Sequence, residues 1–77
     1  MKRIIWNETI LEEFKRDAML TPDETSVVDG LAQQKTRVSM ALRLNVSLST
    51  VDRLIRTVWK KYDQASLYNP LLPPLIR

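Results

Sequence analysis

Residues 36–62 constrain the fold more than any other stretch, because they contain two helical patterns separated by a break. Before the break, apolar residues recur at the spacing of a helix face: Val38, Ala41, Leu42 and Val46. The sequence Leu44-Asn45-Val46 interrupts the pattern, and asparagine tolerates the left-handed backbone of a tight turn. This stretch therefore predicts a helix near residues 36–44 that ends in a sharp turn.

The second pattern begins directly after the turn. The hydroxyls of residues 47–50 can cap the first N–H groups of a new helix. Its apolar residues then stand three and four apart: Val51, Leu54, Ile55, Val58, Trp59 and Tyr62. These signals predict a helix near residues 49–63. A short helix, a tight turn and a longer basic helix are typical of helix-turn-helix proteins that bind DNA.

Capping signals predict two further helices before this pair. Asn7 is a candidate N-cap for a helix near residues 8–19. Thr21 and Glu24 form a capping-box pattern around Pro22, which predicts a second helix that runs to about Leu31. Apolar residues expected to be buried in this half are Trp6, Ile10, Leu11, Phe14, Ala18, Met19, Val27, Val28 and Leu31. Trp59, Tyr62 and Met40 are likewise expected in the core.

The two ends of the chain have a different character. Asn69-Pro70 ends any helix, and residues 69–77 contain three of the four prolines. This tail is predicted to be extended and is too apolar for a free solvated end, so it either packs back over the helices or docks on a second chain. Residues 1–5 are a basic and apolar lead-in whose role the sequence leaves open. The expected architecture is a single all-α, four-helix domain over residues 1–77, with a helix-turn-helix core at about 35–63.

Composition excludes several classes of function. The chain of 77 residues has no cysteine and no histidine, which removes disulfides, thiol nucleophiles, the usual zinc ligands and histidine acid–base catalysis. Glu12 and Glu13 are adjacent carboxylates, but neighbours on a helix diverge by about 100°. We therefore expect no enzyme, no metal and no cofactor. The absence of a long apolar run or signal-peptide pattern indicates a soluble, cytoplasmic protein without membrane contact.

Charge is segregated along the chain. Residues 1–34 carry four basic and seven acidic side chains, whereas residues 35–61 carry seven basic side chains and one acidic, Asp52. The formal net charge of +3 therefore understates the positive field of the second segment. Such asymmetry attracts and orients a polyanion, although a solvated basic face is common on any helical protein.

The motifs resemble those of known DNA-binding families. Leu20-Thr21-Pro22-Asp23-Glu24, followed by Ala41 to Ser47 and Ser49-Thr50-Val51, resembles the DNA-binding domain of LuxR/GerE-type regulators and region 4 of bacterial sigma factors. Nearly the whole chain after Ile5 resembles small phage or mobile-element helix-turn-helix proteins of low-GC Gram-positive bacteria. The resemblance implies a tetrahelical domain that binds DNA in a bacterial cytoplasm, where it is associated with the nucleoid. Asn45 replaces the usual glycine, and Asp52 stands where a basic residue is common.

The helix-turn-helix interpretation assigns roles to individual side chains. Residues expected to face base edges are Ser49, Thr50, Asp52, Arg53 and Arg56, since the start of the second helix enters the major groove. Residues expected to contact phosphates are Lys35, Arg37, Arg43, Ser47, Lys60 and Lys61. Asp52 must then accept from a cytosine amino group or bind Arg53 or Arg56. Ser47 can either donate to a phosphate or cap the helix, and capping is the favoured role of the two.

The function expected from the sequence is sequence-specific binding of double-stranded DNA and regulation of transcription. One recognition helix reads few base pairs, so a homodimer through the tail 69–77 is expected. Two alternatives stay open. One is a protein-interaction adaptor, like a sigma or anti-sigma factor, with RNA polymerase or another protein as its partner. The other is a phage accessory protein that docks on DNA without sequence specificity.

Overall fold

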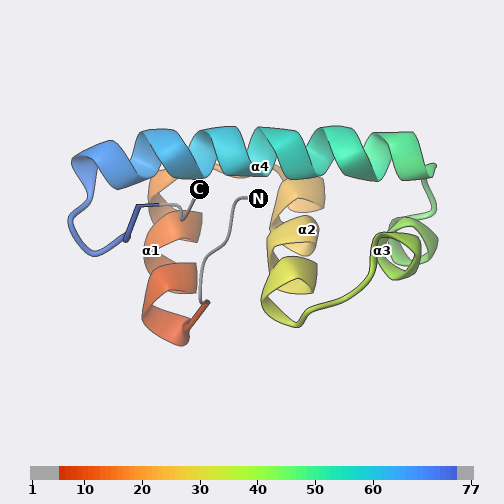
Figure 1. Ribbon diagram of the computed structural model, residues 1–77, viewed down its shortest axis with the longest axis horizontal. Helices are drawn as coiled ribbons and strands as arrows, with labels where there is room; N and C mark the ends of the chain where they lie inside the picture. Colours follow the sequence, from red (N-terminus) through yellow and green to blue (C-terminus); the bar gives the residue numbers. More distant parts are fainter. Residues whose placement is uncertain (1–5, 75–77) are drawn as a thin grey trace.

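This computed structural model describes residues 6–74 of the chain, which contain four helices (Figure 1). They are α1 (Glu8–Asp17), α2 (Pro22–Ala32), α3 (Arg37–Leu44) and α4 (Leu48–Tyr68). Residues 6–74 contain no strand, so the all-α prediction is confirmed. The expected lead-in over residues 1–5 lies outside the described residues.

Each helix begins at a side-chain cap that local chemistry explains. The Asn7 side chain accepts a hydrogen bond from the amide of Ile10, and Thr21 forms a complete capping box with Glu24, both as predicted. Thr36 accepts from the amide of Ser39, so it is the cap of α3 and not its first residue. Ser47 caps α4 in the same way.

The three shorter helices are each followed by a residue with a left-handed backbone. These residues are Met19, Gln34 and Asn45, with φ angles of 50°, 59° and 58°. Only Asn45 was predicted from the sequence. The Asn45 amide donates to the Leu42 carbonyl, and the Val46 amide donates to the Ala41 carbonyl, which is the Schellman arrangement. This arrangement turns the chain sharply between α3 and α4.

Helix α4 is the element on which the other three pack. It has 21 residues, about 31 Å at 1.5 Å per residue. Helices α1 and α2 cross it on one side, and α3 lies near the end where α4 begins (Figure 1). It continues five residues beyond the predicted end at Asp63, because residues 64–68 contain no helix breaker before Asn69-Pro70.

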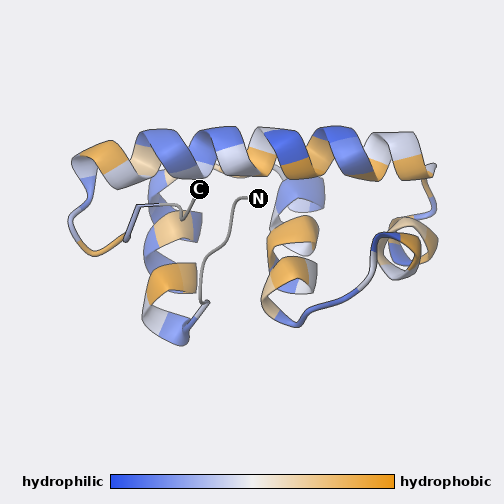
Figure 2. Ribbon diagram, in the orientation of Figure 1, coloured by the Kyte–Doolittle hydropathy of each residue, from blue (hydrophilic) through white to orange (hydrophobic). Residues whose placement is uncertain are grey.

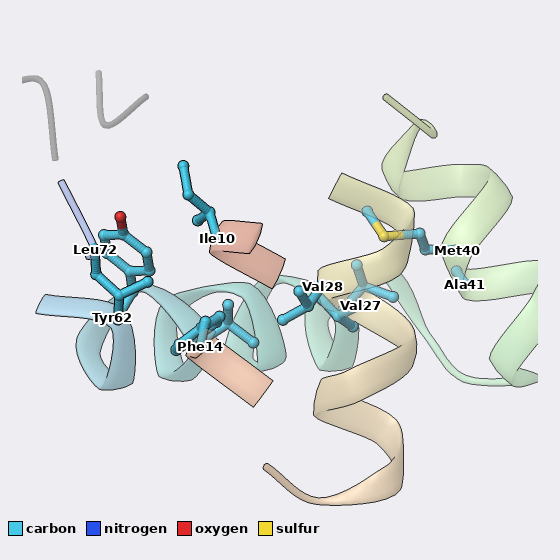
Figure 3. Close-up of a cluster of buried hydrophobic side chains, with 10 residues drawn as sticks. Ile10, Phe14, Val27, Val28, Met40, Ala41, Tyr62 and Leu72 are labelled. Carbon is cyan, nitrogen blue, oxygen red and sulfur yellow. The ribbon is translucent and has the colours of Figure 1, made fainter. Parts of the chain in front are cut away.

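The core lies between α4 and the helices beneath it. Its buried apolar residues are Ile10, Phe14, Val27, Val28, Met40, Ala41, Val51, Val58, Tyr62 and Leu72 (Figure 3). The ring of Trp6 lies 5.9 Å from that of Phe14 and 6.1 Å from that of Trp59. The core assignments of Phe14, Trp59 and Tyr62 are confirmed, with Trp59 partly exposed.

Some other burial predictions were wrong. Met19 is 86% exposed because it lies in the turn after α1, outside the helix face. Of the predicted stripe of Val38, Ala41, Leu42 and Val46, Ala41 is buried and Val46 is partly buried, whereas Val38 and Leu42 face solvent. Met40, which was also expected in the core, is buried as predicted. Two apolar faces compete on this eight-residue helix, and contact with α2 and α4 selects between them. Leu31, which was expected in the core, is partly buried and packs against it, as Trp59 does.

The tail returns toward its own chain. A turn closes with the hydrogen bond from the Leu72 amide to the Asn69 carbonyl, at 3.0 Å. Leu72 is 2% exposed, and the Tyr62 hydroxyl donates to the Pro73 carbonyl at 2.5 Å. The first part of the tail therefore packs in cis, while residues 75–77 lie outside the described residues. None of the helices within residues 6–74 is long and apolar enough to cross a membrane.

Candidate nucleic-acid interface

The connection between α3 and α4 sets the geometry of the candidate site. Three residues, 45–47, join the helices, and the Val46 amide bonds the Ala41 carbonyl at 3.0 Å. The Ser47 hydroxyl accepts from the Thr50 amide at 3.2 Å and lies 3.0 Å from the hydroxyls of Ser49 and Thr50. Ser47 is therefore engaged as a cap, so its hydroxyl is already occupied by contacts within α4.

Four exposed polar residues form a line on the outer face of α4. They are Ser49, Arg53, Arg56 and Lys60, here called the outer stripe. Their spacing of four, three and four residues keeps them within one face, over about 16 Å at 1.5 Å per residue. The buried residues of α4, Val51, Val58 and Tyr62, lie on the opposite side of the helix. Hydrophilic segments alternate with hydrophobic ones along the α4 ribbon (Figure 2). Gln64 continues the line, and its spacing from Lys60 would have identified it in the sequence.

The cations of the outer stripe have no partners within the part of the chain that the structure describes. Arg53, Arg56 and Lys60 form no ion pair or side-chain hydrogen bond among residues 6–74. The backbone carbonyl of Arg53 accepts from the Thr57 hydroxyl, which leaves the guanidinium unaffected. Three unneutralised positive charges on one helix face create a field that attracts an anion.

Asp52 is bound by Arg37, a partner that the sequence pattern did not predict. Its two carboxylate oxygens receive the fork of the Arg37 guanidinium, at 2.7 Å and 2.6 Å. The expected partners Arg53 and Arg56 do not pair with it. Arg37 was expected to contact phosphate, but its charge is neutralised by this neighbouring carboxylate on the same surface. The pair joins the start of α3 to the first part of α4.

Lys61 points to another carboxylate. Its ammonium lies 2.5 Å from Glu24, whose side chain is 8% exposed and also caps α2. Burial alone would raise the pKa of Glu24, but the hydrogen bonds from Lys61 and Thr21 outweigh it and hold that pKa below its ordinary value. Lys61 therefore connects α4 to α2, and its charge is largely neutralised inside the fold.

The remaining expected contacts are distributed around the α3–α4 pair. Arg43 and Lys35 are exposed and have no ion pair among residues 6–74. Thr50 is partly buried, and its hydroxyl contacts Ser47. Among those residues, no group of three or more acidic side chains is arranged to hold a metal ion.

Comparisons with protein-family models, with curated proteins and with solved structures give no match for this chain. What the surface can bind is therefore inferred from its geometry and charge.

Proposed function

We propose that the protein binds double-stranded DNA as a helix-turn-helix domain, with the first half of α4 in the major groove. The observation that carries the proposal is the outer stripe, whose three cations are exposed and unpaired within residues 6–74. It begins directly after the sharp turn, where a recognition helix would begin.

The width of α4 with its side chains suits the width of the major groove. A helix with its side chains is about 10–12 Å wide, and the major groove of B-form DNA is about 12 Å wide. Ser49, Arg53 and Arg56 face base edges in this arrangement, and an arginine can bond O6 and N7 of guanine together. Lys60, Arg43 and Lys35 then contact phosphates and fix the register. Arg37 and Lys61 leave this set, because Asp52 and Glu24 already bind them.

Regulation of transcription in the bacterial cytoplasm is the role that fits a small specific DNA reader, in line with the LuxR/GerE and sigma region 4 resemblance.

A protein-interaction adaptor is the second candidate. The exposed apolar side chains of Val38 and Leu42 favour it, because they are four residues apart and so share one face of α3. Such an adaptor would bind an acidic protein surface by the same outer stripe.

The test is selection of bound sequences from random duplexes, followed by binding measurements on the enriched sequence and on random DNA. Arg53→Ala should lose about 1–3 kcal/mol on the selected sequence, about 5- to 150-fold, and much less on random DNA. Arg53→Lys keeps the charge but loses the planar fork, so it should retain random binding and lose discrimination.

Arg16→Ala is the matched control, because it removes the same charge from α1, where Arg16 is 69% exposed. It should change both affinities only slightly. Equal losses for Arg53→Ala on selected and random DNA would indicate docking without specificity. No binding at about 150 mM salt would reject the DNA function and direct attention to a protein partner.

A further inference from the structure

The ion pair between Arg37 and Asp52 affects the surface of α4 more than the stability of the fold. The two residues are 15 positions apart, and the packing of α3 against α4 brings them together. Their side chains are 56% and 43% exposed, and ion pairs so open to solvent add little to stability. Arg56 stands four residues after Asp52, the usual spacing of an ion pair within a helix. Asp52 binds Arg37 instead, which leaves the Arg56 guanidinium without a partner among residues 6–74.

Asp52 lies beside the outer stripe. It follows Ser49 by three residues and precedes Arg56 by four, so the three side chains are neighbours on the surface of α4. In the proposed DNA complex, on which this inference rests, Ser49 and Arg56 face base edges, and Asp52 then approaches the same groove. Phosphates repel a carboxylate in this position unless a cation neutralises it. The Arg37 guanidinium provides that neutralising charge.

The paired carboxylate of Asp52 can still accept hydrogen bonds. Its two oxygens offer about four lone-pair positions, and the Arg37 fork takes one position on each oxygen. No other side chain donates to Asp52 within residues 6–74. Because the guanidinium is planar and binds both oxygens, it also fixes the plane of the carboxylate. Asp52 is therefore a neutralised and oriented acceptor at the edge of the outer stripe.

An acceptor of this kind matches one base in the major groove. Guanine presents two acceptors there, and thymine presents an acceptor and a methyl group. Adenine presents a donor beside the acceptor N7, which repels a carboxylate. Cytosine presents the N4 amino donor without a neighbouring acceptor, so its edge is complementary to an ionised carboxylate.

We propose that Asp52 reads a cytosine by accepting a hydrogen bond from its N4 amino group. Arg37 is the positioning residue, because it acts through Asp52 by neutralising and orienting the carboxylate. The target of the protein then contains a cytosine at the position that Asp52 faces. The carboxylate at a position where related helices commonly carry a basic residue becomes a determinant of sequence specificity.

The first experiment selects bound sequences from random duplexes with the wild type, Asp52→Asn and Asp63→Asn. An asparagine amide combines a donor and an acceptor, which suits adenine N6 and N7. One position of the selected motif should therefore change from cytosine in the wild type to adenine in Asp52→Asn. Asp63→Asn is the matched control, since it removes the same charge about three turns further along α4, and it should keep the cytosine. Thermal melting checks that both variants stay folded.

The second experiment changes the DNA. N4-methylcytosine at the identified position keeps its base pair, but the methyl group replaces the amino hydrogen that faces the major groove. The wild type should bind this duplex about tenfold more weakly than the unmethylated one, because a hydrogen bond to a charged group is lost. Asp52→Ala has no acceptor at this position and should bind the two duplexes equally.

The positioning role of Arg37 is tested by two variants. Arg37→Ala leaves Asp52 without its counter-charge, so it should weaken binding to all DNA and reduce the preference for cytosine. Arg37→Lys restores a positive charge without the planar fork, so it should recover binding to random DNA but only part of the preference. An ion pair with a purely structural role would alter thermal stability and leave the base preference unchanged.

The outcomes separate this inference from the proposed function. A wild-type motif that Asp52→Asn selects without change at any position overturns the cytosine contact and leaves DNA binding intact. An equal loss on the methylated duplex for the wild type and Asp52→Ala also overturns it, since the methyl group then acts on another part of the protein. If the wild type binds no DNA at about 150 mM salt, the DNA function and the cytosine contact both fail.

Discussion

The guanidinium of Arg37 binds both carboxylate oxygens of Asp52, with its Nε 2.6 Å from Oδ1 and its Nη2 2.7 Å from Oδ2. Arg37 is the first residue of α3, and Asp52 lies in the second turn of α4. The pair therefore bridges the two helices of the proposed DNA reader. Its members are 56% and 43% exposed, so it contributes little to stability, under about 1 kcal/mol. Its main effect is on the charge of the surface.

Asp52→Asn should strengthen binding to random DNA and weaken discrimination. The substitution removes the one carboxylate among residues 35–61 and frees Arg37 to contact phosphate. Each additional phosphate contact makes the slope of log binding constant against log salt concentration more negative by about 0.9, so we expect a change of about one. Salt titrations of wild type and variant on random duplexes measure this slope. Glu12→Gln, which removes a charge from the exposed face of α1, is the control. An unchanged slope would place Arg37 outside the interface.

Glu24→Gln should make the protein less stable at neutral pH and should reduce the loss of stability that occurs in acid. The charged Glu24 both caps α2 and binds Lys61, and hydrogen bonds to charged groups contribute about 2 kcal/mol each. Because the folded-state pKa of Glu24 lies below its ordinary 4.5, this contribution is fully present above pH 4.5 and is lost as the pH falls through the folded-state pKa.

Urea denaturation of wild type and Glu24→Gln at pH 7 and pH 3 measures the difference. The two should differ by about 2 kcal/mol in free energy of unfolding at pH 7 and by less at pH 3. Asp23→Asn, at an exposed position in the same turn, is the control for general acid effects. The same cost at both pH values would mean that Glu24 acts by packing and not by its charge.

Local chemistry made the helix boundaries predictable from the sequence. Asn7, Thr21 with Glu24, and Asn45 each act through atoms within a few residues, so the pattern alone identifies them. The end of α4 was missed, because residues 64–68 carry neither a strong period nor a breaker.

Interactions between distant residues could not be predicted in the same way. Lys61 and Glu24 are 37 positions apart, and only the crossing of α4 over α2 brings them together. The candidate site shares this limit. The spacing of Arg53, Arg56 and Lys60 identifies a common face of α4 from the sequence. It does not show that Asp52 and Glu24 bind Arg37 and Lys61, two other residues expected to contact phosphate.

Gly30→Ala should fail to stabilise the protein, although Gly30 lies inside α2. In a helix interior, replacing glycine by alanine normally raises the free energy of unfolding by about 1 kcal/mol. Here a Cβ atom would lie 2.6 Å from the Met40 sulfur and 3.0 Å from its Cγ, so the buried Met40 must shift. In a Met40→Ala background this obstacle is absent, and the same substitution should recover the helix gain. A double-mutant cycle by denaturation measures the coupling, and additive effects would contradict the contact.

Tyr62→Phe should loosen the tail while it leaves the core packed. The Tyr62 hydroxyl donates to the Pro73 carbonyl at 2.5 Å, and the ring lies 5.2 Å from that of Phe14. Loss of this hydrogen bond should cost about 1 kcal/mol at pH 7. Exchange of the Leu72 amide, which bonds Asn69, should accelerate more than exchange of amides in α2. Equal acceleration everywhere would indicate global destabilisation and no specific role for the hydroxyl.

The same hydroxyl should make stability depend on alkaline pH. Burial, with the negative charge of Asp63, raises the pKa of Tyr62 from 10.0 to about 12. A raised pKa means that the neutral form stabilises the fold below pH 10 and that this contribution is lost as the pH rises through 12. The chain has two tyrosines, so Tyr68→Phe leaves Tyr62 as the only phenol, and its ultraviolet absorbance then reports one titration. A midpoint near 12 is expected, and the Tyr62→Phe, Tyr68→Phe double variant should lose stability less steeply between pH 10 and 12. A midpoint near 10 would mean that Tyr62 is open to solvent and that its bond to Pro73 does not hold the tail.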